Sequence, residues 1–246
     1  MKKIFVVGIG PGKKDCMTFE AAAALEKSEV IVGYSKYVEL VRSYFPSAEF
    51  FQNGMTGEVS RCRHALELAS SGRTVAVVCS GDSGVYGMAA LVLELSVQFP
   101  SVEIEIVTGV TAALGGSALL GSPLTVDFCV ISLSNILMSQ EKIEKKLRSA
   151  ASADFTIVLY NPMSKSRPDT LKKACDILLE ILPPQTPCGW VRNIAREGEE
   201  CRICTLGELG GENLDMFCTV FIGNSSMRIV EGGGRKWLVQ PRGYGV

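Results

Sequence analysis

Histidine is almost absent from this chain of 246 residues, which contains a single one, His64. Catalytic triads of the Ser-His-Asp or Cys-His kind, and histidine-based zinc sites, need a well-placed imidazole. His64 lies in a helical pattern among charged residues, where a position on the surface is expected. The scarcity of histidine therefore argues against triad and zinc chemistry, and no metal site is predicted.

The chain also lacks long apolar runs and an excess of either charge. No apolar run reaches the roughly 18 to 20 residues of a membrane span, and the first residues show no signal-peptide pattern. The 25 basic and 26 acidic side chains nearly cancel, leaving a formal net charge of -1. No overall field attracts nucleic acid or an anionic membrane. We expect a cytoplasmic protein without nucleic-acid or membrane partners, in which local basic side chains meet any anionic ligand.

The nine cysteines are an odd number scattered along the chain. Cys79, Cys129 and Cys188 fall in apolar runs, which is typical of buried, reduced thiols rather than of a disulfide framework. The one close pair, Cys201 and Cys204, lies in a strand pattern with no second pair or histidine nearby. A structural interpretation of this pair is favoured, and any further role for it is left open.

In the first half of the chain, short apolar runs alternate with helical patterns. This alternation predicts βαβ units and a mostly parallel sheet whose strands are buried on both faces. A loop is expected around residues 52–54. The expected strands are residues 4–7, 30–32, 74–79 and 103–107, and the expected helices are residues 18–28, 35–44, 58–71 and 85–98.

The pattern changes after a small-residue helix at residues 112–120, and we place a domain boundary there. The predicted fold is two α/β domains, residues 1–121 with a mostly parallel sheet and residues 122–246 with a mixed sheet. Too few residues separate the strands 200–205 and 216–222 for a crossover helix, which predicts antiparallel pairing at that edge. The glycine-rich tail from residue 232 is expected to be loosely held. The other expected elements are strands 127–132, 155–160 and 188–192 and helices 140–151 and 168–182.

Two glycine-rich turns follow predicted strands, at residues 8–12 and 79–88. The carboxyl ends of parallel strands are where α/β proteins hold ligands. The first turn fails as a dinucleotide motif, because Lys13 replaces the third glycine and no acid ends the second strand. It fails as a phosphate-binding P-loop as well, because Lys14 follows Lys13 where serine or threonine is required. The glycines of this first turn have an equally good interpretation as simple turn formers.

In the second turn, Asp82 has a simple interpretation as a helix cap, worth about 1 kcal/mol. That interpretation does not explain why Gly81, Gly84 and Gly87 leave the backbone bare over so short a stretch. The close approach of a flat ligand does explain it. We therefore expect a small-molecule enzyme with a ligand at this turn.

Short distinctive motifs are spread over nearly the whole chain. They are Val7-Gly8-Ile9-Gly10-Pro11-Gly12 with Met17-Thr18, Gly33-Tyr34 with Tyr37, Ser80-Gly81-Asp82-Ser83-Gly84-Val85-Tyr86-Gly87-Met88, Gly109-Val110-Thr111-Ala112, Pro123-Leu124, Asp127-Phe128, Ile131-Ser132-Leu133-Ser134, Tyr160-Asn161-Pro162, Ser164-Lys165, Arg192-Asn193, Arg196 and Pro241-Arg242-Gly243-Tyr244.

With these motifs the chain resembles the tetrapyrrole methyltransferases that use S-adenosylmethionine, and within them the subfamily that methylates C-17 of precorrin-3B in cobalamin biosynthesis. The resemblance implies a methyl transfer coupled to ring contraction, with S-adenosylhomocysteine as product, a tetrapyrrole substrate and a homodimer. It implies a donor site between the two halves of the chain, at Gly81, Asp82, Ser83, Val85, Tyr86, Thr111, Ala112, Tyr160, Asn161, Gly189 and Trp190. It implies a substrate trough lined by Gly10, Pro11 and Gly12, for which the candidate partners of the substrate carboxylates are Lys13, Lys14, Lys165, Arg167, Arg192 and Arg196.

The chain departs from the family pattern at Lys13, Val126 and Asn135, where relatives often carry an acid, a histidine and an aspartate. No catalytic base is therefore assigned. Two alternatives remain open: a methyltransferase of this fold acting on another target, such as a different precorrin carbon, and a tetrapyrrole or nucleoside binder without turnover. The sequence also leaves open whether the macrocycle carries cobalt.

Overall fold

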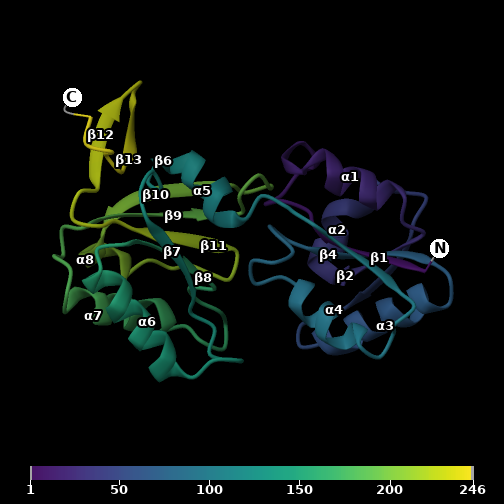
Figure 1. Cartoon of the computed structure of the whole chain (residues 1–246). Coiled ribbons are helices and arrows are strands. Elements are labelled where there is room, and N and C mark those ends of the chain that lie inside the picture. Colours follow the sequence, from purple (N-terminus) through teal and green to yellow (C-terminus); the bar gives the residue numbers. More distant parts are fainter. Residues whose placement is uncertain (1, 245–246) are drawn as a thin grey trace. The chain divides into compact units, whose positions relative to one another are not determined.

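The computed structural model describes residues 2–244, and the chain divides into two compact units (Figure 1). Unit 1 is Met1–Ala112 and unit 2 is Ala113–Val246. This division falls before the body of helix α5 (Ala112–Leu120), whereas the sequence analysis places a boundary after it. The reason is packing. A Cβ atom added to Gly116 would lie 3.1 Å from the Phe221 ring, so α5 lies directly on the sheet of unit 2.

Unit 1 is built on a five-stranded sheet in the order β3-β2-β4-β1-β5. All neighbouring strands in it are parallel. Runs such as Val75 to Val78 are buried on both faces, as strands between two helical layers require. The predicted α/β class and the parallel sheet are confirmed. The strands are β1 (Lys3–Gly8), β2 (Val30–Tyr34), β3 (Glu49–Asn53), β4 (Thr74–Cys79) and β5 (Glu103–Val107).

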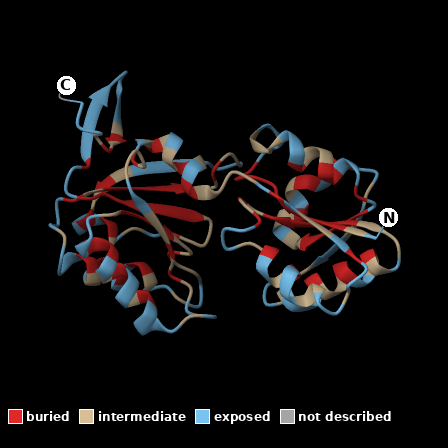
Figure 2. Cartoon of the chain, viewed as in Figure 1, coloured by how far each residue is buried: buried red, intermediate tan, exposed pale blue. Residues whose placement is uncertain are grey.

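Helices cover both faces of this sheet, and the buried residues alternate between two cores (Figure 2). One core lies under α3 (Glu58–Ser70) and α4 (Ala89–Ser96). The other lies under α1 (Phe19–Glu26) and α2 (Ser35–Arg42). Thr18 caps α1 by accepting a hydrogen bond from the backbone N–H of Ala21 at 3.0 Å. A short 3-10 helix, η1 (Lys14–Cys16), follows the first glycine turn.

Two predictions for unit 1 are wrong. Strand β3 lies where a loop is predicted, because this edge strand is largely exposed and has no apolar run. Helix α4 begins at Ala89 rather than near Val85. Residues 80–88 instead form an extended turn, whose hydrogen bonds are described below.

Unit 2 contains a mixed sheet in the order β10-β9-β11-β8-β7, as predicted for the second half of the chain. Only β7 and β8 are parallel; the other pairs are antiparallel. One face packs against α6, α7 and α8, and the other meets α5. The elements are β7 (Phe128–Ser132), α6 (Gln140–Ser152), β8 (Thr156–Tyr160), α7 (Thr170–Leu179), β9 (Pro187–Arg192), β10 (Glu200–Thr205), α8 (Leu206–Leu209) and β11 (Cys218–Ile222).

Strands β10 and β11 do not pair with each other, although each is antiparallel to a neighbour. Strand β9 lies between them, and the chain connects them through α8.

The prediction of a loosely held tail is wrong. Strands β12 (Arg228–Gly232) and β13 (Arg235–Val239) form a hairpin, and β13 pairs with β6 (Gly121–Ser122). The turn residues Gly233 and Gly234 both have positive φ, at 63° and 77°, as a tight hairpin turn demands.

All nine cysteines are free thiols, as predicted. Burial raises the pKa of Cys79 and of Cys204 to about 12, so both are protonated at neutral pH. Cys201, the other half of the close pair, is exposed. Over residues 2–244, no helix combines the length and the apolar character needed to cross a membrane.

Candidate functional site

The carboxyl ends of β1, β4 and β5 meet at three glycines. A Cβ atom on Gly8 would lie 2.7 Å from the amide nitrogen of Gly109 and 2.8 Å from the carbonyl oxygen of Gly81. A Cβ atom on Gly109 would overlap the same Gly81 oxygen. Three chain segments therefore pack backbone against backbone, which only glycine permits. Gly8 and Gly109 are absent from the predicted site. Each lies close after a predicted strand, so the sequence alone could have placed them at this junction.

The two glycine turns are joined by a pair of hydrogen bonds. The N–H of Gly10 donates to the Gly81 carbonyl at 3.0 Å, and the N–H of Gly81 donates to the Gly10 carbonyl at 2.8 Å. Both residues have positive φ, at 73° and 72°. Pro11 and Gly12 are buried beside them, while Lys13 is exposed. The two turns recognised separately in the sequence thus form one structural element, the strand-end junction.

Asp82 accepts three backbone hydrogen bonds. Its Oδ1 accepts from the N–H groups of Gly84 and Val85 at 2.8 and 3.1 Å. Its Oδ2 accepts from the N–H of Gly109 at 2.9 Å. Asp82 is therefore not a helix cap, since α4 begins seven positions later. The N-cap residue of α4 is Met88, whose side chain makes no capping hydrogen bond. The carboxylate instead fixes the shape of the turn and ties it to the end of β5.

Other contacts of the turn explain most of its glycines without a ligand. A Cβ atom on Gly87 would overlap the Ser83 carbonyl oxygen, and Gly81 needs its positive φ. Buried Ser83 donates through Oγ to the Val107 carbonyl at 3.0 Å. The interpretation that a flat ligand requires all three glycines is therefore corrected: the turn's own packing requires Gly81 and Gly87. The exposed part of the turn is Gly84, Val85 and Tyr86.

The structure brings several predicted donor residues together in unit 1. A Cβ atom on Gly81 would lie 3.5 Å from Thr111 Cα and 3.6 Å from the Ala112 nitrogen. Residues 111–112 therefore run beside residues 81–83. Tyr86 is just over half exposed, with φ of 55°, a conformation that side-chain-bearing residues seldom adopt. A left-handed tyrosine on an exposed turn is the kind of outlier found at ligand sites.

In unit 2, the ends of the parallel strands β7 and β8 form a second polar cluster. Asn161, with φ of 55°, donates through Nδ2 to the Ser132 Oγ at 2.9 Å. The Tyr160 hydroxyl oxygen accepts from the N–H of Ala113, at the start of α5, at 2.7 Å. Arg167 donates to the Leu133 carbonyl at 3.4 Å. The sequence motifs at residues 131–134 and 160–167 therefore lie side by side, and Ser132 is a site candidate that the sequence analysis missed.

Gly189 and Trp190 occupy opposite faces of β9. A Cβ atom on Gly189 would lie 2.9 Å from Leu120 of α5, so this glycine lets the helix approach the sheet. Trp190 packs on the other side, in the core under α6 and α7, and is 3% exposed. Its Nε1 has no hydrogen-bond partner within residues 2–244. The two side-chain positions therefore do not share a face, and a common ligand would meet Trp190 through its backbone.

The predicted basic residues differ in how far they are already engaged. Arg192 forms ion pairs with Glu200 at 2.9 Å and Asp215 at 3.4 Å, and donates to the Asn213 carbonyl. Lys14 lies over the rings of Tyr44 and Phe45, at 5.9 and 5.7 Å from their centroids. The side chains of Lys13 and Lys165 are exposed, whereas Arg167 and Arg196 are partly buried.

A family model, curated relatives and a solved structure all match this chain over most of its length. The family model described as Tetrapyrrole (Corrin/Porphyrin) Methylases matches residues 3–210. A probable cobalt-factor III C(17)-methyltransferase of Salmonella typhimurium is 43% identical over 240 residues, covering 97% of this chain and 98% of that protein. A precorrin-3B C(17)-methyltransferase of Sinorhizobium sp is 39% identical over 246 residues, covering 98% and 96%. The crystal structure of the methyltransferase CobJ superposes with a TM-score of 0.88 at 36% identity, covering 97% and 99%.

Asp82→Asn tests the role of the carboxylate in the turn. An amide offers one oxygen where three N–H groups converge, and its NH2 group would face a backbone donor. We expect a loss of about 1–3 kcal/mol in the free energy of unfolding, measured by denaturant titration followed by circular dichroism. Glu94→Gln, an exposed acid on α4, is the control and should be neutral. Equal stability of the Asp82→Asn and Glu94→Gln variants would contradict the assignment.

Proposed function

Because this chain belongs to the tetrapyrrole (corrin/porphyrin) methylase family, we propose that it transfers a methyl group from S-adenosylmethionine to C-17 of a cobalt-factor III or precorrin-3B macrocycle in cobalamin biosynthesis. Contraction of the ring is part of this proposal. The observation that carries it is near-complete coverage by relatives with this activity at 39–43% identity. The motifs at residues 131–134 and 160–162, which are typical of the C-17 subfamily and lie together in unit 2, support the same assignment.

The strand-end junction fits an adenosyl methyl donor. The exposed part of its turn is Gly84, Val85 and Tyr86. Because Gly84 has no side chain, the backbone there is open to a ligand. Asp82 already satisfies the N–H groups of Gly84 and Val85, so the turn is rigid before any ligand binds. We propose that carbonyl oxygens and side chains of this turn, with Thr111 and Ala112 beside it, bind the donor. The predicted unit 2 residues Tyr160, Asn161, Gly189 and Trp190 remain part of this proposed set.

The donor supplies an already activated sulfonium methyl, whose bond to sulfur breaks with the electron pair remaining on sulfur as the new carbon–carbon bond forms. The protein has no need of a strong acid for this step. Its residues align the reactants and exclude water, and alignment alone accounts for a large part of the acceleration in such reactions. This division of labour is consistent with a junction whose carboxylate, Asp82, holds backbone N–H groups in place rather than serving as an acid catalyst.

The acceptor macrocycle carries several carboxylates, so cationic side chains are its expected partners. Lys13 and Lys165 are exposed and free of ion pairs among the described residues, and we propose both as contacts, with Arg167 and Arg196 as further candidates. Arg192 is engaged with two carboxylates, and we assign it a structural role in unit 2. A homodimer completes the proposal and rests on the family resemblance, while a cytoplasmic location stays a prediction from the sequence.

The function is tested by incubating purified protein with S-adenosylmethionine and either cobalt-factor III or metal-free precorrin-3B. Product analysis by mass spectrometry should show the gain of one methyl group and its position at C-17, with one of the two substrates preferred. Methylation at another carbon would favour a different specificity within the family. Binding without methyl transfer would favour a non-catalytic binder, an alternative motivated by Val126 and Asn135.

Lys165→Ala and Arg192→Ala separate a substrate contact from a structural cation. Lys165→Ala should raise the KM for the acceptor by about tenfold, the equivalent of one charge-assisted hydrogen bond, and leave stability unchanged. Arg192→Ala leaves Glu200 and Asp215 without their partner, and should chiefly lower the unfolding midpoint followed by fluorescence. Both tryptophans, Trp190 and Trp237, lie in unit 2, so fluorescence reports on that unit. Unchanged stability of Arg192→Ala together with a raised KM would reverse the assignment.

A further inference from the structure

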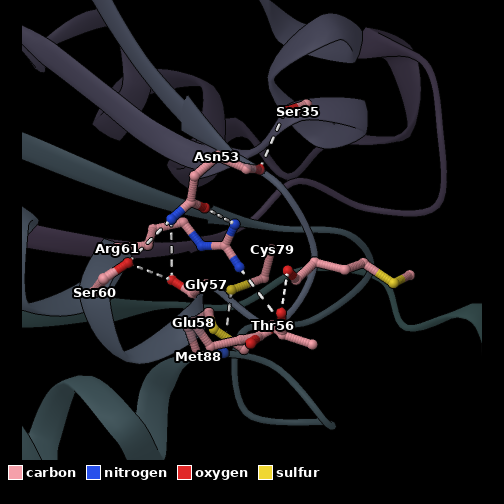
Figure 3. Close-up of polar contacts among 10 residues, drawn as sticks. Ser35, Asn53, Thr56, Gly57, Glu58, Ser60, Arg61, Cys79 and Met88 are labelled. Atoms are coloured by element: carbon pink, nitrogen blue, oxygen red, sulfur yellow. Dashed lines mark hydrogen bonds and ion pairs between the residues drawn. The ribbon is translucent and has the colours of Figure 1, made fainter.

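A buried arginine supports a strained, exposed loop at the carboxyl end of β3. Arg61, on the first turn of α3, is 3% exposed. Its Nη1 donates to Asn53 Oδ1 at 2.6 Å, and Nη2 lies 3.7 Å from the Glu58 carboxylate (Figure 3). Arginine is rarely buried to this extent. A buried ion pair contributes little net stability, because desolvation offsets the attraction.

Asn53 passes the support from Arg61 to the loop. Its Nδ2 donates to the Gly57 carbonyl at 3.1 Å and lies 3.2 Å from the Ser60 Oγ. The backbone carbonyl of Asn53 accepts a hydrogen bond from the Ser35 hydroxyl at 3.1 Å. This bond joins the loop to the chain just after β2. A Cβ atom on Gly57 would lie 2.5 Å from Asn53 Nδ2, so a side chain there would displace the Asn53 amide from these hydrogen bonds. Figure 3 shows the Asn53 and Arg61 side chains meeting next to the segment that contains Thr56.

Two residues of the loop are unusual in backbone conformation or in exposure. Thr56 has φ of 65°, a strained conformation for a residue branched at Cβ. Met55 is 51% exposed. An exposed methionine is a flexible apolar group suited to packing against a flat, apolar surface. Strain at Thr56, rigid support from below and an exposed methionine are together typical of a binding loop.

The loop lies at the edge of the sheet that carries the strand-end junction. Strand β3 is separated from β4 by β2 alone, which places the two strand ends about 10 Å apart at normal strand spacing. Arg61 also lies close to the end of β4: burial raises the pKa of the Cys79 thiol to about 12, and the Arg61 charge acts against that rise. Cys79 in turn accepts a hydrogen bond from the N–H of Met88, at the end of the donor turn.

We propose that residues 54–57 form a contact loop for the acceptor macrocycle, in which Met55 packs against the apolar face of the ring and Arg61 acts as the positioning residue. This inference rests on the proposed function. A broad ring system spans the distance from the junction to β3, whereas the smaller methyl donor is held at the junction. The loop therefore contributes to recognition of the acceptor and not of the donor.

Met55→Glu tests the contact directly, because it places a carboxylate against a ring system that itself carries carboxylates. Binding is measured with uroporphyrin III as a stable tetrapyrrole probe and with S-adenosylhomocysteine as the donor probe. We expect the Kd for uroporphyrin III to rise at least about tenfold, as expected from losing a buried methionine contact, with the donor Kd unchanged within about twofold. Met55→Leu should bind both probes like the wild type.

Val97→Glu is the matched control. Val97 is 82% exposed at the carboxyl end of α4. That helix runs back from the carboxyl ends of the strands, so Val97 lies toward their amino ends. The same charge change there should leave both Kd values unaltered. An equal loss of uroporphyrin III binding in both glutamate variants, or no loss in Met55→Glu, would overturn the proposal.

Arg61→Lys and Arg61→Met test the positioning role. The lysine variant keeps the charge and one bond to Asn53, and should raise the acceptor KM several-fold with kcat and donor KM near those of the wild type. The methionine variant should raise the acceptor KM further. A merely structural role would instead lower the unfolding midpoint and reduce donor and acceptor binding together. Wild-type protein that binds neither probe would refute the proposed function itself, whereas an active enzyme indifferent to the Met55 and Arg61 substitutions would refute only this inference.

Discussion

The carboxylate of Asp82 and the glycines around it impose the constraint on which the rest of unit 1 depends. Three neighbouring strands end within contact distance of one another, and the chain must leave each of them without a side chain in the way. Gly8 and Gly109 meet that steric demand, and Gly81 supplies the positive φ that its turn requires. Asp82 then satisfies N–H groups from two of the departing segments at once. The result is a turn whose shape is fixed by its glycines and by hydrogen bonds from backbone N–H groups to the Asp82 carboxylate.

This construction suits a methyl transfer. The donor brings its own activation, so the protein needs accurate placement more than a titrating catalyst. Specificity for the acceptor is then free to reside in separate loops, such as residues 54–57 on their buried Arg61 support and the exposed cations Lys13 and Lys165. On this proposal, donor binding and acceptor choice are carried by different parts of the molecule.

Much of the fold follows from the sequence, because parallel strands buried on both faces appear as short apolar runs between helical patterns. Strand β3 was missed, since an exposed edge strand such as Glu49–Asn53 has no such run. The start of α4 was misplaced because Asp82 bonds to Gly84 and Val85 and delays the helix. The pairing of β10 with β9, and the hairpin of the tail, depend on partners distant in sequence. For the candidate site, the motifs predicted segments that the structure brings together within each unit, but not the contacts that single residues make. Gly189 accommodates Leu120, and Arg192 pairs with Glu200 and Asp215, neither of which is evident from spacing.

The central claim is that Asp82 forms the donor turn before the donor arrives. Amide hydrogen exchange of Gly84, Val85 and Gly109, followed by mass spectrometry with and without S-adenosylhomocysteine, tests it most directly. The account predicts that these amides are already protected in the free protein, and that the ligand adds protection mainly at residues 84–86 and 111–112. Free exchange of Gly84, Val85 and Gly109 until the ligand binds, or no effect of the ligand on this turn, would contradict it.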